Sequence, residues 1–298
     1  MSLKLKDIPT LFKNAFAQLW RTEPLILASA TAFFTLFSLA PIMVILASIL
    51  SIIFRNNKIS ESLFQPLERV FGSETSEQIQ AIVANVKSVA GDWYITLGGF
   101  IFLLFVATNL LKIIKKAINQ LWRIRKSHRR RIKYSLRERL IAILLILSIG
   151  FIFIISLLLD TSVAFLQGYL EQLIPSVDTI LIRTVNIIFS ILVVTAWFTI
   201  VYKILPDAVV HWKVALVGGL LTAVLFTIGK WILGYLLNYS NMVTIFGTFA
   251  SVLFILLFIF YSSLILYFGA AFTHAYASLT DRPIKPRKHS VNFEVRSI

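Results

Sequence analysis

The stretch 28-ASATAFFTLFSLAPIM-43 lies within an apolar run that extends from residue 24 to residue 54. About 20 mostly apolar residues are enough to cross a bilayer, so this run predicts a membrane-spanning helix. Leucine and isoleucine alone would meet that need, yet the run also carries hydroxyl side chains. Thr31, Thr35 and Ser38 are spaced by four and three residues, which places them on one face of a helix.

This hydroxyl stripe predicts a face that meets other helices rather than lipid. In lipid, helices associate through close backbone approach and interhelical hydrogen bonds, and small or hydroxylated residues mark such faces. Pro41 has no amide hydrogen for the carbonyl of Phe37, so we also expect a bend near residues 37–41. The stripe either packs as a seam or lines a polar path between helices. Other apolar runs carry further candidates for the seam or path: Asn109, Asn186, Gly247 and Ser251.

The whole chain has the composition of a membrane protein. Of its 298 residues, 58% are hydrophobic and 14% are charged, whereas about 25% of an average soluble domain is charged. Six apolar runs are long enough to span a bilayer: 24–54, 93–114, 139–159, 179–203, 213–237 and 244–274. The predicted fold class is therefore all-α, a polytopic membrane protein with six transmembrane helices.

The distribution of lysine and arginine predicts how these spans are oriented. Residues 112–139 hold twelve Lys and Arg against one acid, whereas residues 160–178 hold three acids and no base. Since basic loops stay in the cytoplasm, we expect this loop and both termini to be cytoplasmic. Anionic lipid headgroups are the expected partners there. The residues assigned to that lipid surface are Arg123, Arg125, Arg129, Arg130 and Arg131.

The remaining organisation follows from local patterns. Apolar residues recur at helical spacing before Trp20, which predicts an amphipathic helix lying in the membrane interface; a helix capping the bundle is the alternative. The first outer loop has the pattern of short amphipathic helices. The predicted regions are residues 1–22, the cytoplasmic interfacial helix; 23–274, the transmembrane domain with outer loop 55–92 and basic cytoplasmic loop 115–138; and 275–298, a cytoplasmic disordered tail.

Two polar features lie near the ends of predicted spans. Lys230 is about seven residues from the outer end of its span, where its ammonium group reaches the interface or an outward-facing cavity that holds an anionic group. The stretch 205-LPDAVVHW-212 places Asp207 and His211 between two spans at the inner mouth. That position fits either a gate or a plain tight turn.

Three motifs of this chain resemble the YihY/BrkB family of bacterial membrane proteins, formerly described as ribonuclease BN. They are ASATAFFTLFSLAPIM, the stretch 205-LPDAVVHWKVALVGGLLTAVLF-226, and KWILGYLL followed by IFGTFASVLFILLFIFYSSLILYFGAAFTHAYA. The resemblance implies six spans, both termini inside, and a role in envelope lipid handling or solute transport. Where the family usually has Gly-Ala-Glu, this chain has Gly269-Ala270-Ala271, which argues against a proton-coupled mechanism through that glutamate. Phe246-Gly247 likewise replaces the usual Tyr-Gly.

Two functions from different classes are compatible with these features. The first is a transporter or envelope lipid-handling protein with a polar cavity, whose cargo is an unidentified solute or lipid. The second is a non-transporting scaffold that binds a partner through the basic loop. A membrane-bound ribonuclease is disfavoured, because the four histidines lie in separate segments and there is no cysteine or carboxylate cluster for metal-assisted cleavage. We therefore expect no enzyme activity, catalytic residue, metal, cofactor or nucleic-acid partner, and leave open whether the chain forms a homo-oligomer.

Overall fold

The computed structural model describes residues 7–53, 93–126, 148, 179–239, 249–287 and 290–292. Most of these residues are helical, as the sequence predicts. The helices are α1 (Ile8–Trp20), α2 (Pro24–Ile53), α5 (Trp93–Leu121), α7 (Thr179–Ile204), α8 (Trp212–Tyr239) and α10 (Phe249–Leu279). Four short strands accompany them: β1 (Ile124–Lys126), β2 (Ala208–Val209), β3 (Lys285–Pro286) and β4 (Ser290–Asn292).

Five of the six predicted spans coincide with long helices, namely α2, α5, α7, α8 and α10. Within the described residues, three stretches are long and apolar enough to cross a membrane: Ile187–Ile204, Trp212–Leu236 and Val252–Leu279. The described apolar part of α2, Pro24–Ser38, is shorter. The predicted span 139–159, apart from Ser148, and the predicted helices of loop 55–92 lie outside the described residues. The chain is thus a membrane protein with several apolar helices, and the count of six spans stays a prediction.

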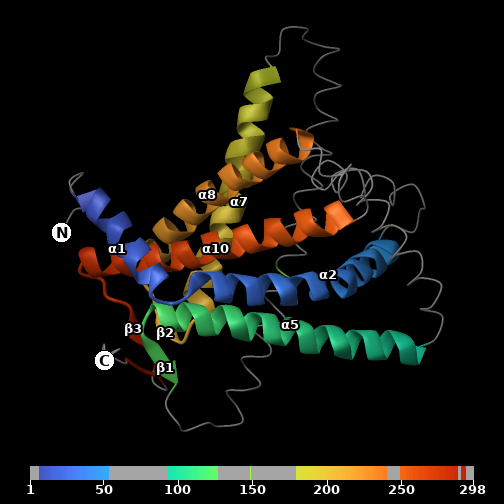
Figure 1. Ribbon diagram of the computed structural model, residues 1–298, viewed down its shortest axis with the longest axis horizontal. Coiled ribbons are helices and arrows are strands. Elements are labelled where there is room, and N and C mark those ends of the chain that lie inside the picture. The colour runs from blue at the N-terminus through green and yellow to red at the C-terminus, as the bar shows by residue number, and fades with distance from the viewer. Residues whose placement is uncertain are drawn as a thin grey trace.

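The long helices form a row. Along it, α5 lies beside α2, α2 beside α10, α10 beside α8, and α8 beside α7, while α1 packs on α10, α5 also contacts α10, and Tyr202 of α7 reaches α10 through a hydrogen bond. Figure 1 shows that the row converges where the strands lie and spreads at its other end, so that α5 and α7 diverge. We call the converging end the basic end. Both α1 and β4, near the two termini, lie at this end (Figure 1).

Helix α1 is amphipathic in the way its sequence predicts. Leu11, Ala15 and Leu19 are buried against the bundle. The adjoining face, with Phe16 and Trp20 stacked on each other at 5.7 Å between ring centroids, is exposed. Helix α1 therefore caps the bundle with one face and presents an apolar face outward. Its placement in a membrane interface stays a prediction.

The turn between α1 and α2 uses all three residues of Thr22-Glu23-Pro24. The Thr22 hydroxyl donates to the carbonyl of Leu19 at 2.6 Å, so it closes the end of α1. Glu23 adopts a left-handed backbone with φ of 52°, and Pro24 is the first residue of α2, where its missing amide hydrogen is harmless. Pro41 lies inside α2, and Figure 1 shows the axis of α2 changing direction in its second half.

The expectation of a disordered tail is wrong for the described part of residues 275–298. Helix α10 continues to Leu279, and both later strands find partners. Strand β3 pairs antiparallel with β2, with Val209 opposite Lys285, and β4 pairs antiparallel with β1, with Arg125 opposite Val291. The tail is ordered because two distant connections offer it backbone hydrogen bonds, which its own composition does not reveal. The predicted basic loop 115–138 also begins too early, since α5 continues to Leu121.

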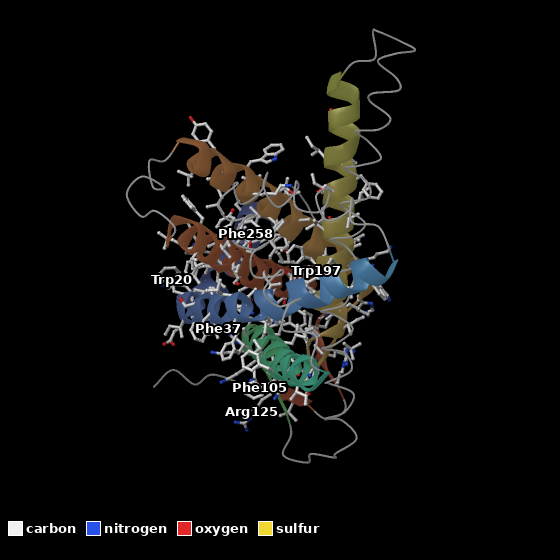
Figure 2. The ribbon with its side chains drawn as sticks, turned by 90° about the vertical axis from the view of Figure 1, so that its right-hand side faces the viewer. Trp20, Phe37, Phe105, Arg125, Trp197 and Phe258 are labelled. Atoms are coloured by element: carbon white, nitrogen blue, oxygen red, sulfur yellow. The ribbon has the colours of Figure 1, made fainter. Side chains whose placement is uncertain are left out.

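The core lies toward the basic end of the row. Its largest fully buried side chains include Tyr202, Tyr267, Ile118 and Leu121, which come from α7, α10 and α5. Large apolar side chains elsewhere face outward, among them Phe37 on α2 and Phe105 on α5 (Figure 2). Outward-facing apolar side chains are expected where lipid is the solvent, because their exposure is not unfavourable there.

Candidate functional site

The hydroxyl stripe of α2 lies at its contact with α10. Thr31 is buried and donates to the carbonyl of Leu27 at 2.8 Å. Its oxygen also lies 2.5 Å from the hydroxyl of Tyr267 on α10, and since the Thr31 proton points to Leu27, Tyr267 is the donor in this pair. Within α2, the Thr35 hydroxyl donates to the carbonyl of Thr31 and the Ser38 hydroxyl donates to the carbonyl of Thr35, and both distances are 2.7 Å. Thr31 is therefore the member of the stripe that bonds across the contact of α2 with α10, while Thr35 and Ser38 bond within α2.

Glycine and threonine interlock where α8 crosses α10. A Cβ added at Gly218 would overlap Thr273 Oγ1, and one added at Gly269 would overlap Thr222 Oγ1. Each helix thus supplies a glycine that receives a threonine of the other. Both threonine hydroxyls are satisfied within their own helices, Thr222 by the carbonyl of Gly218 at 2.7 Å and Thr273 by that of Gly269 at 2.6 Å. Small residues therefore permit the close backbone approach that holds helices together in lipid.

Gly219 lies on a different side of α8, where the helix packs against α7. A Cβ at this position would lie 2.5 Å from Thr199 Oγ1 and 2.9 Å from both the Thr195 carbonyl oxygen and the Thr199 amide nitrogen. The adjacent glycines thus bring α8 close to α10 on one side and α7 on the other. Because each glycine permits the close approach of a different helix, the sequence has glycine at both adjacent positions.

Side-chain donors from α7 and from the residue that follows α5 reach one short stretch of α10. The Tyr202 hydroxyl on α7 donates to the carbonyl of Leu266 at 2.8 Å and lies 2.9 Å from Thr222 Oγ1. Trp122, just beyond α5, donates from Nε1 to the carbonyl of Ala270 at 2.8 Å. With Tyr267 bound to α2, these bonds fasten α2, α5, α7 and α8 around α10.

Two buried polar atoms of α7 have no hydrogen-bond partner in the described structure. They are Thr195 Oγ1 and Trp197 Nε1. Trp197 is labelled in Figure 2, and its ring packs on Phe198 with centroids 4.9 Å apart. An unpaired donor in apolar surroundings is unfavourable, so these two atoms lower the stability of α7 packing.

Asp207 is the centre of a polar cluster at the basic end. Its carboxylate lies 2.7 Å from Lys115 Nζ and accepts a hydrogen bond from Asn119 Nδ2 at 2.9 Å. Its amide donates back to Asn119 Oδ1 at 2.9 Å. The Lys115 and Asp207 side chains are 15% and 13% exposed, so this ion pair is largely shielded from water. The connection between α7 and α8 is thereby tied to α5.

Arg287 of the tail joins the same cluster. Its amide donates to the Asp207 carbonyl at 3.0 Å, and its guanidinium donates to the carbonyls of Ala208 at 3.0 Å and Ile204 at 3.4 Å. Lys203 donates to the carbonyl of Val210 and lies 5.2 Å from the centre of the Trp212 ring. Cations at the end of α7 complement the partial negative charge of its last carbonyls.

A third set of contacts ties α1 into this end. Gln18 donates from Nε2 to the carbonyl of Leu121, the last residue of α5. Its amide atoms lie 3.1 and 3.2 Å from His274 Nδ1 on α10. Gln18 therefore links α1, α5 and α10, although the sequence pattern assigns it only to the polar side of α1.

The predicted site residues are not brought together into one site. Thr31 bonds across to α10, Thr35 and Ser38 bond within α2, Asn109 is half-buried on α5, and Lys230 is exposed on α8. Arg123 and Arg125 are exposed at the basic end. Pro41, Asn186 and Ser251 lie within α2, α7 and α10, and their side chains are outside the described part of the chain. Gly247, Arg129, Arg130 and Arg131 lie outside the described residues. Ala271, at the position of the family's usual glutamate, is fully buried.

The sequence patterns did not identify the residues that make most of the hydrogen bonds between helices. Tyr202 and Tyr267 lie within predicted apolar runs, yet a tyrosine in a span is itself a signal because its hydroxyl needs a partner when buried. Asn119 and Arg287 were counted only as parts of a loop and a tail. Among the described residues, no group of three or more His, Asp or Glu side chains lies where it could hold a metal ion.

Aromatic residues mark both ends of α8. Trp212 and Trp231 are 61% and 57% exposed. Their positions are nineteen residues apart, which corresponds to about 29 Å along a helix and matches the hydrocarbon thickness of about 30 Å. Such paired aromatic positions are typical of spans that are anchored at both interfaces. Together with the apolar exteriors of α7 and α10, they define the class: a multi-pass α-helical membrane protein.

The chain belongs to the family described as Virulence factor BrkB, whose model matches residues 15–292. This confirms the resemblance carried by the three motifs. A UPF0761 membrane protein of Pseudomonas paraeruginosa is 31% identical over 245 residues, which cover 82% of this chain and 57% of that protein. A UPF0761 membrane protein of Chlorobium phaeobacteroides is 27% identical over 286 residues, or 94% of this chain and 62% of that protein. The chain thus spans less than two thirds of these relatives' length, and no solved structure matches it.

Proposed function

We propose that this protein handles lipid as a transporter of the bacterial inner membrane, with six spans, both termini in the cytoplasm and no enzymatic activity. The placement of charge supports the orientation. Apart from Arg183 and Lys230, every lysine and arginine in the described residues lies at the basic end. Positively charged segments are retained in the cytoplasm. Helix α1 and strand β4, at the same end, support the placement of both termini there.

The exposed amine of Lys230 is the observation that carries the lipid proposal. Lys230 lies eighteen residues beyond Trp212 on α8, or about 27 Å along the helix, next to the exposed Trp231. This is the depth of the headgroups in the opposite leaflet. A lysine there that is exposed rather than enclosed between helices favours an anionic headgroup over a small solute.

The hydrogen bonding of the hydroxyl stripe also favours lipid over a small hydrated solute. Thr31 and Ser38 are buried, and each described hydroxyl of the stripe has a protein partner. Their hydroxyl protons are therefore already used within the protein, which disfavours a solute that would need hydrogen-bond donors along α2. Lipid, by contrast, meets the exposed apolar side chains of α8 and α10 directly, among them Leu220 and Leu257.

On the cytoplasmic side, anionic lipid is the proposed partner of the basic residues. Arg123 and Arg125 are exposed next to β4. Each basic residue near an anionic surface contributes about 1 kcal/mol. These residues thereby hold the basic end against the membrane surface. Binding of the transported lipid is assigned to the other end of the row, near Lys230.

Native mass spectrometry of the protein, released gently from its own membrane, tests the proposal. We expect a retained adduct of phospholipid mass, with occupancy reduced about fivefold in Lys230→Ala, which corresponds to about 1 kcal/mol. Lys213→Ala is the matched control, because Lys213 is an exposed lysine at the other end of the same helix. Equal occupancy in both variants would remove Lys230 from the site. The absence of any adduct from the unaltered protein would favour the scaffold function instead.

A further inference from the structure

Helix α1 has three faces, because its residues follow one another around the axis at about 100° per residue. The first face packs on the bundle and consists of Leu11, Ala15 and Leu19. The second lies next to it, is exposed, and is called here the aromatic face: Phe12, Phe16 and Trp20. The third is exposed and mostly polar: Thr10, Lys13, Asn14 and Ala17. The aromatic face therefore lies between a face that contacts protein and a face suited to water.

The aromatic face contacts the bundle at one edge and is exposed at the other. The Phe12 ring packs on Phe268 and Phe272 of α10, with centroids 6.2 and 5.3 Å apart. Phe16 and Trp20 stack on each other and are 56% and 63% exposed. Figure 2 shows Trp20 at the outer edge of the bundle. Adjacent exposed rings of this kind mark a surface that is covered by a membrane or by a protein.

Two observations identify lipid as the cover of the aromatic face. First, exposed apolar side chains resume directly after the turn into α2, where Leu25 and Ile26 are 52% and 63% exposed. Second, the exposed cations Lys13 and Arg21 border the aromatic face. A helix that presents aromatic residues beside lysine and arginine is typical of the membrane interface. Lipid explains both observations, because its acyl chains solvate the start of α2 and its headgroups attract the cations.

The contacts of Gln18 determine which face of α1 points outward. Its Nε2 donates to the carbonyl of Leu121, and its amide atoms lie 3.1 and 3.2 Å from His274 Nδ1. These contacts hold α1 against α5 and α10 in one rotational setting. Figure 1 shows α1 running obliquely across α10 at the basic end, rather than beside it as a further span. An oblique helix with one exposed aromatic face has the geometry of a helix that lies in the membrane interface.

We propose that α1 is a lipid-bound anchor, which lies in the cytoplasmic interface of the membrane with its aromatic face among the lipids and its polar face toward water. The partner is the phospholipid of that leaflet. Its acyl chains surround Phe16 and Trp20 just below the headgroups, and the headgroups meet Lys13 and Arg21. The choice of leaflet rests on the proposed topology, whereas the contact with lipid rests on the faces of α1.

Neighbouring residues on the two exposed faces provide matched positions for a fluorescent label. The chain has no cysteine, so a single substitution supplies the only thiol. Phe16→Cys carries the label on the aromatic face, and Ala17→Cys carries it one residue further on, on the polar face. Trp20→Cys and Asn14→Cys form a second pair on the same two faces. All four positions are exposed, so the label leaves the buried face of α1 undisturbed.

The test measures quenching of the label in phospholipid nanodiscs by two agents. A phospholipid with a nitroxide group high on its acyl chain quenches from within the lipid, whereas iodide quenches from water. We expect the nitroxide to quench the label at Phe16→Cys at least about threefold more strongly than at Ala17→Cys, because an interfacial helix buries its apolar face about 5–10 Å into the lipid. Iodide should show the reverse order, and the second pair should repeat both results.

Equal iodide quenching on both faces would place the aromatic face in water and overturn the anchor. Protection of the aromatic face from both quenchers would show that a protein, such as a second copy of the chain, covers it, which equally overturns the contact with lipid. Neither measurement involves Lys230 or a retained lipid. Failure of the Lys230 adduct experiment together with nitroxide quenching on the aromatic face would therefore reject the proposed function alone.

Discussion

Gly219→Ala gives the sharpest test of how closely α7 and α8 approach. The added Cβ would lie 2.5 Å from Thr199 Oγ1 and 2.9 Å from two backbone atoms of α7, the Thr195 oxygen and the Thr199 nitrogen. The hydroxyl can rotate away, but the backbone atoms move only if the helices separate. Forcing an extra methyl group into such a contact costs about 1–3 kcal/mol.

Gly234→Ala isolates that clash from the intrinsic preference of alanine for helices. A Cβ at Gly234 would meet nothing within 4 Å, so this change should stabilise α8 by about 0.5–1 kcal/mol. Both variants share the gain in helix propensity. Their difference in free energy of unfolding therefore equals the clash, about 1–3 kcal/mol.

Thermal unfolding in one detergent, followed by tryptophan fluorescence, measures this difference. At about 2–4 °C per kcal/mol for a chain of this size, Gly219→Ala should melt at least about 2 °C below Gly234→Ala. Adding Thr199→Ala should restore only part of the loss, because it removes the hydroxyl contact and leaves both backbone contacts. Equal melting temperatures for the two single variants would refute the close approach of α7 and α8.

Three further predictions concern hydrogen bonds between helices and the orientation. Thr31→Val should lower the free energy of unfolding by about 0.6–1.7 kcal/mol more than Thr35→Val in the same melting assay, because the Thr31 hydroxyl bonds across to α10. Tyr202→Phe should cost about 1–2 kcal/mol, since it removes a buried bond to α10; an unchanged melting temperature would contradict that bond. For orientation, a cysteine replacing the exposed Val291 should react with impermeant maleimide only in inverted vesicles, and one replacing the exposed Tyr235 only in intact cells. The reverse pattern would invert the proposed topology.

The sequence predicted long apolar helices that the structure contains, because the signal for such a helix is local. The run 24–54 corresponds to α2, and residues 213–237 fall within α8. Each follows from the unfavourable exposure of a polar backbone to lipid, which any long apolar segment resolves by forming a helix. The spacing of Thr31, Thr35 and Ser38 likewise predicted a helix–helix face, and the structure places Thr31 in hydrogen-bond contact with Tyr267 of α10.

The partners of these residues were beyond the reach of local patterns. Thr31 meets Tyr267 across 236 positions, and Asn119 meets Asp207 across 88. Hydroxyl, amide and carboxylate groups are compatible with many partners, and only the packed arrangement of helices selects one. The tail shows the same limit, because its proline and charges read as disorder until β1 and β2 supply backbone partners.

The sequence by itself thus determined that this chain is a membrane protein, which residues form its long helices, and which segments carry the positive charge. Those properties depend on transfer of side chains between water and lipid, which each segment undergoes on its own. The tertiary structure alone decided that Thr31 of the hydroxyl stripe bonds to α10, that Gly218 and Gly219 face different helices, and that Asp207 joins the α7–α8 connection to α5. These depend on shape and on hydrogen bonds between distant segments, which exist only once the helices have packed.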